Sequence, residues 1–527
     1  MTTSQRVPGP LLTDLYQLTM AYGYWKVGKQ DGTAVFDYFF RRCPFGGEFA
    51  IFAGLGDLMD FVERFRFAPE EIAYLRQGPL ASADPAFFDW LATVSSSSLK
   101  IWSLPEGSAA FPRVPLVRVE GPLAVAQLLE TPLLYLLNFA SLMTTNAVRY
   151  RRAAGADKVL LEFGLRRAQD GVRASHYAYV GGFDGTSNVE VSEDLGIPPR
   201  GTMAHSFVSS FASLEDLRSR ELVDDGGHVR DFVDLALKYQ KDLGWEQTNE
   251  GELAAFIAYA QAFPRGLVAL VDTYDTLKSG IPNFLIVALA LGTCGYRPLG
   301  IRIDSGDLSY LSLQGRRMFR ETAAATGQDW LAKVSITASN DINEETLWAL
   351  RHQGHEIDAF GIGTHLVTCY GQPAFGGVYK LVSLDGQSRI KLSNDAAKIT
   401  IPGRKEAYRL IRGDGKAFID LMVAVGSPPP RVGERVLCRH PFEETTRVYV
   451  VPRGVIPLHE LVWDSRRVRP QPAPADVRAR VRDEIQLLRD DHMRPINPTP
   501  YKVSVSEELY AYLHSLWMQQ APIDVVS

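Results

Sequence analysis

A guanidinium and two carboxylates stand close together in residues 301–307, which read Ile-Arg-Ile-Asp-Ser-Gly-Asp. Such charged groups are costly beside a core unless they have partners. Arg302 is suited to hold a carboxylate or a phosphate through paired hydrogen bonds. Asp304 and Asp307 can bind a ribose hydroxyl or the water molecules around Mg²⁺. The segment therefore predicts an anion clamp beside a hydroxyl or metal site, although a salt bridge at the rim of a sheet would use the same residue types.

Two further segments contain residues suited to phosphates and flat rings. Gly363 and Thr364 lie in a glycine-containing turn, whose backbone N–H groups and hydroxyl can approach a phosphate closely. Phe163 can stack on a planar ligand, and Arg166, three residues later, can hold phosphate. Each segment also fits a simpler interpretation, because glycine turns are common and a core Phe beside solvated arginines is usual.

His205 lies in a turn of small residues, Gly-Thr-Met-Ala-His-Ser, at positions 201–206. A histidine there can act as a nucleophile or a general base, and it can equally be structural. The sequence contains no G-x-S-x-G element and no evident Ser/His/Asp set, which argues against a hydrolase. It also lacks G-x-x-x-x-G-K-[ST], so any use of ATP is not of the P-loop type.

These residues follow short apolar runs in the middle of the chain, which alternate with helical patterns. The runs end in polar or glycine-containing turns and cover residues 159–161, 267–271, 299–303, 334–336 and 357–360. Alternating strands and helices predict a parallel sheet. The number of units favours an irregular (β/α) barrel over an open sheet, and the fold class is α/β. In either form, ligands bind at the carboxyl ends of the strands, where the polar turns lie.

The two ends of the chain have a different pattern. Residues 13–26 predict a helix capped by Thr13, and residues 35–40 predict a strand. After about residue 380 the pattern indicates meandering strands, followed by a charged helix at about 475–490. The strands expected in this part are 378–382, 390–392 and 398–401.

The composition is that of an ordinary globular protein. The chain has 527 residues, of which 46% are hydrophobic and 22% are charged, and its formal net charge is −5. Because there is no basic excess, we expect no nucleic-acid partner and no membrane partner. The four cysteines are scattered, so we expect no disulfide framework, no zinc site and a cytoplasmic protein. No secretory signal is evident, and the apolar stretch 284–291 is too short to span a bilayer and predicts a buried helix.

Taken together and in order, these segments resemble the nicotinate phosphoribosyltransferases, a family of type II phosphoribosyltransferases. The resemblance extends from about residue 10 to residue 520 and rests on segments 13–20, 42–49, 162–167, 181–188, 201–206, 302–307, 361–364 and 497–503. It implies an irregular α/β barrel joined to a second α/β domain built from both chain termini. The implied boundaries are 116–380 for the barrel, which carries the active site, with 1–115 and 381–527 as the two parts of the second domain.

The resemblance also implies a reaction and its participants. Nicotinate and phosphoribosyl pyrophosphate give nicotinate mononucleotide and pyrophosphate, the first step of NAD synthesis from nicotinic acid. ATP hydrolysis is coupled to the transfer, Mg²⁺ is the expected metal, and two chains form a homodimer with shared active sites. The implied residue roles are ring contact by Phe163 and by the neighbouring subunit's Tyr16, nicotinate binding by Arg302 and Thr202, phosphate binding by Arg166, Gly363 and Thr364, ribose binding by Asp304, and phosphorylation of His205. His365 departs from the smaller residue expected after Thr364, which can alter the edge of the phosphate loop.

Phosphoribosyl transfer depends mainly on positioning and electrostatics, because it passes through a cation-like sugar and needs no strong base. The expected acceptor is the acid, because Arg302 favours a carboxylate and Ser187 stands where nicotinamide-using relatives carry an aspartate in a G-T-D pattern. The alternatives are a related nicotinamide or quinolinate phosphoribosyltransferase, a phosphate-binding barrel lyase or aldolase, and a non-catalytic binding protein. Quinolinate would need more cations than these segments supply, and no Schiff-base lysine is evident at a strand end.

Overall fold

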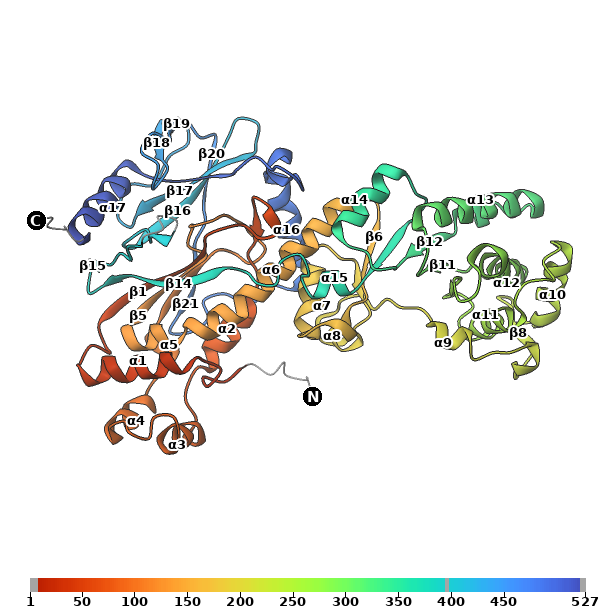
Figure 1. Cartoon of the computed structure of the whole chain (residues 1–527), viewed down its shortest axis with the longest axis horizontal. Helices are drawn as coiled ribbons and strands as arrows, with labels where there is room; N and C mark the ends of the chain where they lie inside the picture. The colour runs from red at the N-terminus through yellow and green to blue at the C-terminus, as the bar shows by residue number, and fades with distance from the viewer. Residues whose placement is uncertain (1–7, 394–397, 522–527) are drawn as a thin grey trace, which may run out of the picture. The chain divides into compact units, whose positions relative to one another are not determined.

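The computed structural model describes residues 8–393 and 398–521, and the chain divides into two compact units. Unit 1 contains residues 1–146 and 371–527, and unit 2 contains residues 147–370. Both ends of the chain therefore build unit 1, where Figure 1 shows red N-terminal and blue C-terminal elements together. The boundaries expected from the sequence lie after residues 115 and 380, whereas the units divide after residues 146 and 370.

The core of unit 2 is a six-stranded parallel sheet with the order β10-β11-β12-β13-β6-β7. Its strands are β6 (Val159–Glu162), β7 (Gly185–Thr186), β10 (Val268–Leu270), β11 (Gly300–Ile303), β12 (Ser335–Ala338) and β13 (Ala359–Ile362). All five apolar runs predicted as strands form strands of this sheet, so the α/β class is confirmed. With β10 and β7 at its two ends, the sheet has the arrangement of half a barrel.

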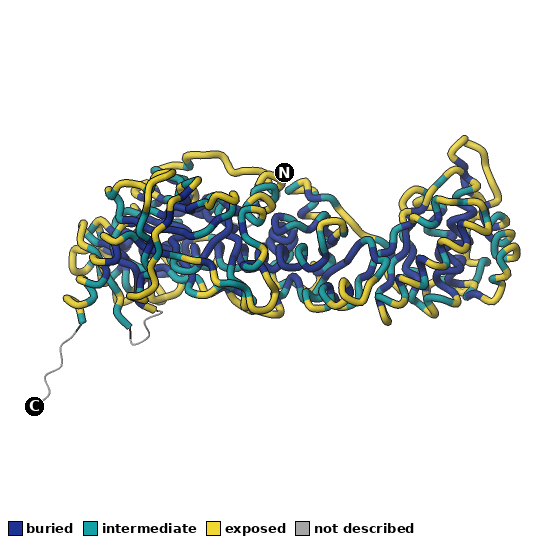
Figure 2. Tube along the Cα trace, turned by 90° about the horizontal axis from the view of Figure 1, so that it is seen from above, coloured by how far each residue is buried: buried dark blue, intermediate teal, exposed yellow. Residues whose placement is uncertain are grey.

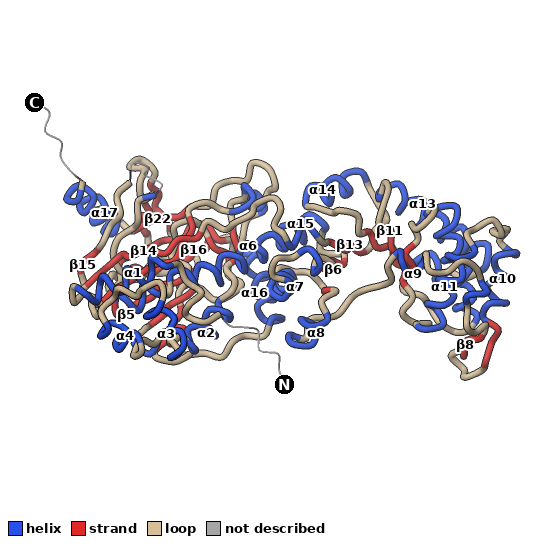
Figure 3. Tube along the Cα trace, turned by 60° about the horizontal axis from the view of Figure 1, so that its bottom comes forward, coloured by secondary structure: helices blue, strands red, loops and turns tan. Residues whose placement is uncertain are grey.

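Helices pack around this sheet (Figure 3). They are α7 (Gly171–Val180), α8 (Val189–Leu195), α9 (His205–Val208), α10 (Phe232–Asp242), α11 (Glu250–Ala262), α12 (Ile281–Thr293), α13 (Leu308–Thr326), α14 (Glu344–Gln353) and α15 (Thr364–Val367). Shorter elements are the turns η3 (Leu165–Arg167) and η4 (Leu214–Asp216), the π-helical turn η5 (Thr276–Gly280), η6 (Asp329–Lys333), and a hairpin of β8 (Glu221–Val223) and β9 (Val229–Asp231). In α12 every residue from Ile281 to Leu291 is buried, as the sequence predicts. A β-carbon at Gly280 would overlap the carbonyl oxygen of Val271, so glycine is needed where η5 meets the end of β10.

Two helical stretches, Leu123–Ala154 and Thr276–Thr293, are long and apolar enough to cross a membrane by length and composition. In their most apolar windows, 67% and 72% of the residues are buried inside the protein. Figure 2 shows the buried residues gathered in the interior of each unit. Burial of this extent is typical of core helices, which pass the same test.

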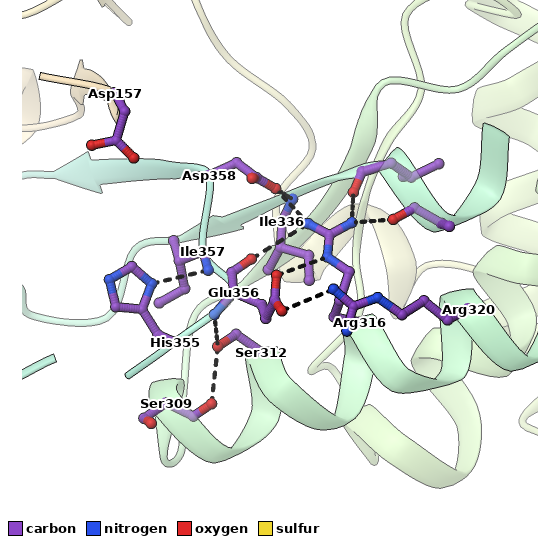
Figure 4. A network of polar contacts seen from close by, with 12 residues as sticks. Asp157, Ser309, Ser312, Arg316, Arg320, Ile336, His355, Glu356, Ile357 and Asp358 are labelled. Atoms are coloured by element: carbon purple, nitrogen blue, oxygen red, sulfur yellow. Dashed lines mark hydrogen bonds and ion pairs between the residues drawn. The ribbon is translucent and has the colours of Figure 1, made fainter. Parts of the chain in front are cut away.

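Arg316 of α13 ties together the segments that lead into β12 and β13 (Figure 4). Its side chain is buried, and its Nη1 donates to the carbonyl of Val334 at 2.6 Å. Its Nη2 donates to Asp358 Oδ2 at 2.7 Å, and the same oxygen accepts the N–H of Ile336 at 2.8 Å. This network fixes the amino ends of two neighbouring strands, and so it sets where their carboxyl ends emerge.

Unit 1 contains two six-stranded sheets, one with the order β15-β14-β1-β5-β3-β21 and one with the order β19-β18-β22-β17-β16-β20, together with a small β2-β4 pair. The strands are β1 (Thr33–Phe40), β2 (Ala50–Ile51), β3 (Lys100–Ser103), β4 (Ala109–Ala110), β5 (Val117–Pro122), β14 (Gly377–Leu384), β15 (Gln387–Ser388), β16 (Lys405–Ile411), β17 (Ala417–Ala424), β18 (Val436–Arg439), β19 (Arg447–Val450), β20 (Gly454–Pro457), β21 (Glu460–Asp464) and β22 (Lys502–Val505). The helices are α1 (Leu15–Lys26), α2 (Leu55–Arg64), α3 (Pro69–Gln77), α4 (Pro85–Leu91), α5 (Leu123–Leu128), α16 (Pro474–Leu487) and α17 (Glu507–Gln520), and α6 (Glu130–Ala154) continues into unit 2. β1 pairs with β14 and β5, so strands from both chain ends share one sheet.

Three local predictions in unit 1 are wrong. Asp14, not Thr13, occupies the N-cap position of α1, but its side chain makes no capping hydrogen bond, and its carboxylate instead accepts a hydrogen bond from Thr131 Oγ1 at 2.9 Å. Residues 390–392 and 398–401 are not strands, and the N–H of Lys391 donates to the Thr400 hydroxyl at 3.0 Å. All four cysteines are free, as expected from their scattered positions.

Candidate active site

The parallel strands of unit 2 bring their carboxyl ends to one edge of the sheet. A polar residue, an aromatic residue or a glycine follows each strand there: Asp272 after β10, Asp304 after β11, Ser339 after β12, Gly363 after β13, Phe163 after β6 and Ser187 after β7. The order of the strands in the sheet therefore brings together residues that are far apart in the sequence.

A cavity of about 230 Å³ lies in this part of unit 2. Six residues predicted as site residues line it: Phe163, Arg166, Arg302, Asp304, Gly363 and Thr364. The cavity wall is mostly polar and mixes cations with carboxylates. Such a lining suits a small, charged, hydrogen-bonding ligand with one flat face.

Arg302 is held on three sides and keeps part of its guanidinium available. Its Nε donates to Ser339 Oγ at 2.7 Å, its Nη2 to Asp304 Oδ1 at 3.1 Å, and its Nη1 to the carbonyl of Met203 at 3.5 Å. The centre of the guanidinium lies 5.6 Å from the centroid of the Phe163 ring. A guanidinium has five N–H groups, so one hydrogen on each terminal nitrogen remains for a carboxylate. Arg302 is therefore both oriented and able to bind an anion.

Gly361 makes room for the Phe163 ring. A β-carbon at position 361 would overlap two atoms of that ring, so only glycine allows the ring to lie against β13. The half-buried ring keeps one side in the cavity wall. The aromatic face and the cation of Arg302 thus lie next to each other, as recognition of a planar anion requires.

Two further cations line the same cavity. Arg166 and Arg167 lie in η3, both are exposed, and neither has an ion-pair partner within residues 8–393 and 398–521. A β-carbon at Gly164 would overlap the side chain of Val367, so this glycine lets η3 pack against α15, which begins at Thr364. Two unpaired guanidiniums beside a glycine and a hydroxyl are suited to phosphate.

His205 lies beside two carboxylates, those of Asp304 and Asp272. Its Nε2 is 3.7 Å from Asp304 Oδ2 and 3.8 Å from Asp272 Oδ1, and its Nδ1 is 3.1 Å from Thr273 Oγ1. Asp272 is almost fully buried, and its Oδ2 accepts the N–H of Asp304 at 3.1 Å. The imidazole therefore lies within 4 Å of two carboxylates, and 46% of the His205 side chain remains exposed to a reactant.

Two predicted site residues are engaged elsewhere in unit 2. The Thr202 hydroxyl donates to the carbonyl of Val268 at 2.5 Å. Asp307 is the N-cap of α13 and accepts the N–H of Tyr310 at 2.9 Å. In the described part of the chain, no group of three or more His, Cys, Asp and Glu residues is arranged to hold a metal ion. A metal here would take most of its ligands from a substrate and from water, as Mg²⁺ commonly does.

Ser187 and Tyr16 lie outside the cavity wall. The N–H of Ser187 donates to the carbonyl of Glu162 at 2.9 Å, which fixes the end of β7 beside the end of β6. The buried Glu162 carboxylate accepts from Thr186 Oγ1 at 2.5 Å and orders the same corner. Tyr16 belongs to α1 in unit 1, and 48% of its surface is exposed.

Sequence reasoning assigned no role to Asp272 or Ser339, whereas Arg167 belongs with Arg166 to the pair of arginines after Phe163 that could hold phosphate. Ser339 directly follows β12, and Asp272 follows β10 after one residue, so the strand-end rule that singled out Asp304 would also have found them. Behind Asp272, burial raises the pKa of Glu252 to about 7, against hydrogen bonds from Ser279 and Asn283, and nearby Asp272 raises it further. Such a residue has no sequence signal, because it lies in an otherwise apolar helix.

Known proteins resemble this chain over almost its whole length. The family model described as the nicotinate phosphoribosyltransferase N-terminal domain matches residues 11–138, and the model of the C-terminal domain matches residues 404–513. The chain is 52% identical to the nicotinate phosphoribosyltransferase of Dictyostelium discoideum over 525 residues, which cover 98% of this chain and 89% of that protein. The chain belongs to the nicotinate phosphoribosyltransferase family.

Other members of the nicotinate phosphoribosyltransferase family agree with this assignment. The human nicotinate phosphoribosyltransferase is 46% identical over 526 residues, with 97% of each chain covered. The crystal structure of human nicotinic acid phosphoribosyltransferase has a TM-score of 0.87 and 42% identity, and the match covers 96% of this chain and 99% of that one. The resemblance inferred from the sequence is therefore confirmed. Both family-model segments belong to unit 1, and in the sequence they come before and after residues 147–370, which form the unit with the cavity.

Proposed function

We propose that this chain is a nicotinate phosphoribosyltransferase that joins nicotinate to phosphoribosyl pyrophosphate and releases nicotinate mononucleotide and pyrophosphate. The observation that carries the proposal is the single cavity in which Arg302 and Phe163 lie together beside Asp304, with unpaired arginines in the same wall. A cation next to an aromatic face suits a pyridine carboxylate, and the unpaired arginines suit phosphates.

The acid substrate would bind beside Phe163. The two remaining guanidinium hydrogens of Arg302 would take the carboxylate, while Phe163 stacks on the pyridine ring. The partner subunit's Tyr16 would cover the opposite ring face in a homodimer with shared sites. Thr202 would assist only after exchanging its present bond to Val268, because its hydrogen is already donated.

The sugar phosphate would extend toward η3 and α15. Arg166, Gly363 and Thr364 would hold phosphate oxygens, and Asp304 would accept a hydrogen bond from a ribose hydroxyl. Asp304 and Asp307 would hold Mg²⁺ through its water molecules, and the ion would supply positive charge to the pyrophosphate leaving group. Two carboxylates fit such an outer contact better than a metal site made wholly by protein ligands, which the described residues do not form.

The reaction needs alignment more than acid–base catalysis. The pyridine nitrogen attacks C1 of the ribose on the face opposite the departing pyrophosphate. Phe163 and Arg302 fix the direction of the nitrogen, and the phosphate contacts fix the sugar. Negative groups such as Asp304 lie where positive charge develops on the ribose, which lowers the energy of the transition state.

We also propose that His205 couples ATP to this cycle as a phosphohistidine. Its exposed ring lies beside Asp272 and Asp304, and its Nδ1 lies 3.1 Å from Thr273 Oγ1, so the ring is oriented while Nε2 faces the carboxylates next to the cavity. Phosphorylation adds two negative charges next to the cavity and would change the order of the loops around it. We further propose a cytoplasmic homodimer without nucleic-acid or membrane partners, with unit 2 as the barrel domain and unit 1 as the domain made from both termini.

Direct incubation tests the function. The full-length protein is given phosphoribosyl pyrophosphate and Mg²⁺ with nicotinate, nicotinamide or quinolinate, with and without ATP, and products are separated by chromatography. We expect nicotinate mononucleotide, with a higher rate when ATP is present. Formation of nicotinamide mononucleotide alone, of product from quinolinate alone, or of no mononucleotide would contradict the proposal.

A further inference from the structure

His365 lies in the wall of the cavity, directly after Thr364 in α15. Its ring is packed edge-on against Tyr370, with 5.1 Å between the ring centroids. The residue is half-buried, so its ring is held in place while part of it faces the cavity. The roles discussed so far do not use this side chain.

The imidazole of His365 has no hydrogen-bond partner within the two described ranges of the chain: its Nδ1 is screened from solvent, whereas its Nε2 remains accessible to a ligand in the cavity. Other histidines of this protein bond through a ring nitrogen to backbone or hydroxyl groups, namely His205, His355, His440, His459, His492 and His514. A histidine that only packs in a core normally has such a partner, because an unpaired buried polar atom costs about 1–3 kcal/mol. His365 is therefore better explained by a ligand than by packing.

The surroundings of His365 indicate the chemistry of that ligand. Arg166 and Arg167 line the same cavity and have no ion-pair partner among the described side chains. Thr364 supplies a hydroxyl at the neighbouring position, whereas Asp341 is a carboxylate in the wall that would repel an anion from its own side. A group with several acceptor oxygens and negative charge can satisfy the arginines, the hydroxyl and the imidazole together.

We propose that His365 is a further substrate-binding residue, whose imidazole donates a hydrogen bond to a phosphate group of phosphoribosyl pyrophosphate. This inference rests on the proposed function. Because Tyr370 already fixes the ring, little rotamer freedom is lost on binding. The bond is made to the phosphoribosyl substrate and not to the pyridine, so its loss weakens one substrate selectively.

The test compares two variants of the full-length protein. His365→Phe keeps a flat ring that can pack against Tyr370 but has no donor, whereas His365→Gln keeps an N–H donor near the position of Nε2. We expect His365→Phe to raise the KM for phosphoribosyl pyrophosphate about tenfold, as for the loss of one hydrogen bond to a charged group. The KM for nicotinate stays within twofold, and His365→Gln lies closer to the parent than His365→Phe. His352→Phe is the matched control, because His352 is an exposed histidine of α14 outside the cavity wall.

Direct binding identifies which phosphate is contacted. Ribose 5-phosphate and inorganic pyrophosphate are titrated separately by calorimetry, and His365→Phe should weaken one of them about tenfold. Unchanged KM for phosphoribosyl pyrophosphate and unchanged binding of both probes in a parent enzyme that makes nicotinate mononucleotide would overturn the inference alone. A parent enzyme that makes no mononucleotide would instead overturn the proposed function. If His365→Phe does not fold, His365→Ala carries the same expectation.

Discussion

At the scale of single residues, each charged side chain at the cavity is oriented by neighbouring residues and keeps some of its polar atoms available for a ligand. Arg302 is fixed by Ser339 and Asp304 and retains hydrogens on both terminal nitrogens. His205 is set beside Asp272 and Asp304 and keeps nearly half of its surface exposed. The site is therefore preorganised: a ligand can bind to the remaining hydrogens of Arg302 while the bonds to Ser339 and Asp304 stay in place.

Ser187 is expected to decide between acid and amide. Ser187→Asp adds a negative charge at the end of β7 that opposes the nicotinate carboxylate. We expect the KM for nicotinate to rise about tenfold, which corresponds to about 1.4 kcal/mol, and nicotinamide to become a substrate. Steady-state kinetics with both pyridines measure this, and Ser187→Asn is the uncharged control of similar size. Unaltered nicotinate kinetics in Ser187→Asp would show that Ser187 does not determine the choice between the acid and the amide.

His205 is expected to carry the coupling to ATP. His205→Ala removes the only group at this position that can be phosphorylated, while the cavity residues that bind both substrates remain. We expect basal transfer to persist and stimulation by ATP to be lost, measured as nicotinate mononucleotide formed with and without ATP. His228→Ala is the matched control, because the His228 side chain is 73% exposed in the β8–β9 hairpin region. Normal stimulation in His205→Ala would assign the coupling to another residue.

The site residues differ in how far the sequence predicts them. Arg302 and Asp304 could be predicted because charged residues at the end of an apolar run need partners or ligands. Gly361 is visible as a glycine, but its reason, the room it gives to Phe163, depends on a contact between two different strands. The partners of His205 could not be predicted either, since Asp272 meets it only through the order of β10 and β11.

At the scale of elements, the site depends on where the parallel strands end, and strand positions are fixed at their other ends. Arg316 links α13 to the segments before β12 and β13 (Figure 4). The strands themselves could be predicted from short apolar runs that stop at polar turns. Residues 390–392 have a similar short run yet form no strand, because Lys391 bonds to a threonine side chain in place of a neighbouring strand.

Removal of Arg316 is expected to loosen the sheet. Arg316→Met leaves the carbonyls of Val334 and Ala332 without their donor and removes the cation beside the half-exposed Asp358, so we expect unit 2 to lose about 2 kcal/mol of stability. Hydrogen exchange of the β12 and β13 amides and the thermal midpoint measure the loss. Arg320→Met is the matched control, because Arg320 pairs with Glu356 at 3.0 Å but its side chain is 61% exposed, so we expect a loss below about 1 kcal/mol. Equal effects of the two substitutions would contradict the role given to Arg316.

At the scale of the whole molecule, one continuous unit carries the cavity and the other is assembled from both ends of the chain. The sequence changes its pattern near residue 380, and the chain passes from unit 2 to unit 1 after residue 370. The exact limits of the units could not be read from the sequence, because α6 continues from one unit into the other without a break in its helical pattern.

Unit 1 should lose stability in acid through His459. Burial lowers the pKa of His459 to about 4, although its Nε2 donates to the carbonyl of Pro115 at 2.7 Å and this bond opposes the shift. The native state keeps this ring neutral, while the unfolded chain takes up a proton below its ordinary pKa. The contribution of the neutral His459 to the free energy of unfolding is therefore intact above about pH 6.5 and falls as the pH drops toward 4.

Through His459, we expect the free energy of unfolding to be about 2 kcal/mol lower at pH 5 than at pH 7. Urea unfolding across this range measures the difference. His459→Gln keeps an N–H for Pro115 but does not titrate, so its unfolding free energy should change less between these two pH values. A variant with the same pH dependence as the parent would show that other groups govern acid unfolding.

The sharing of one sheet by β1 and β14 has a consequence for biosynthesis. A ribosome releases the chain from its N-terminus, so unit 2 can be complete while strands β14 to β22 of unit 1 have not yet been made. At about 5–20 residues per second, residues 371–527 take roughly 10 to 30 s to synthesise. During that time the apolar strand β1, which has seven buried residues, exposes an edge that only β14 will cover. A nascent chain of this protein thus carries a finished catalytic unit beside an unfinished one, and the unfinished unit is where we expect molecular chaperones to bind.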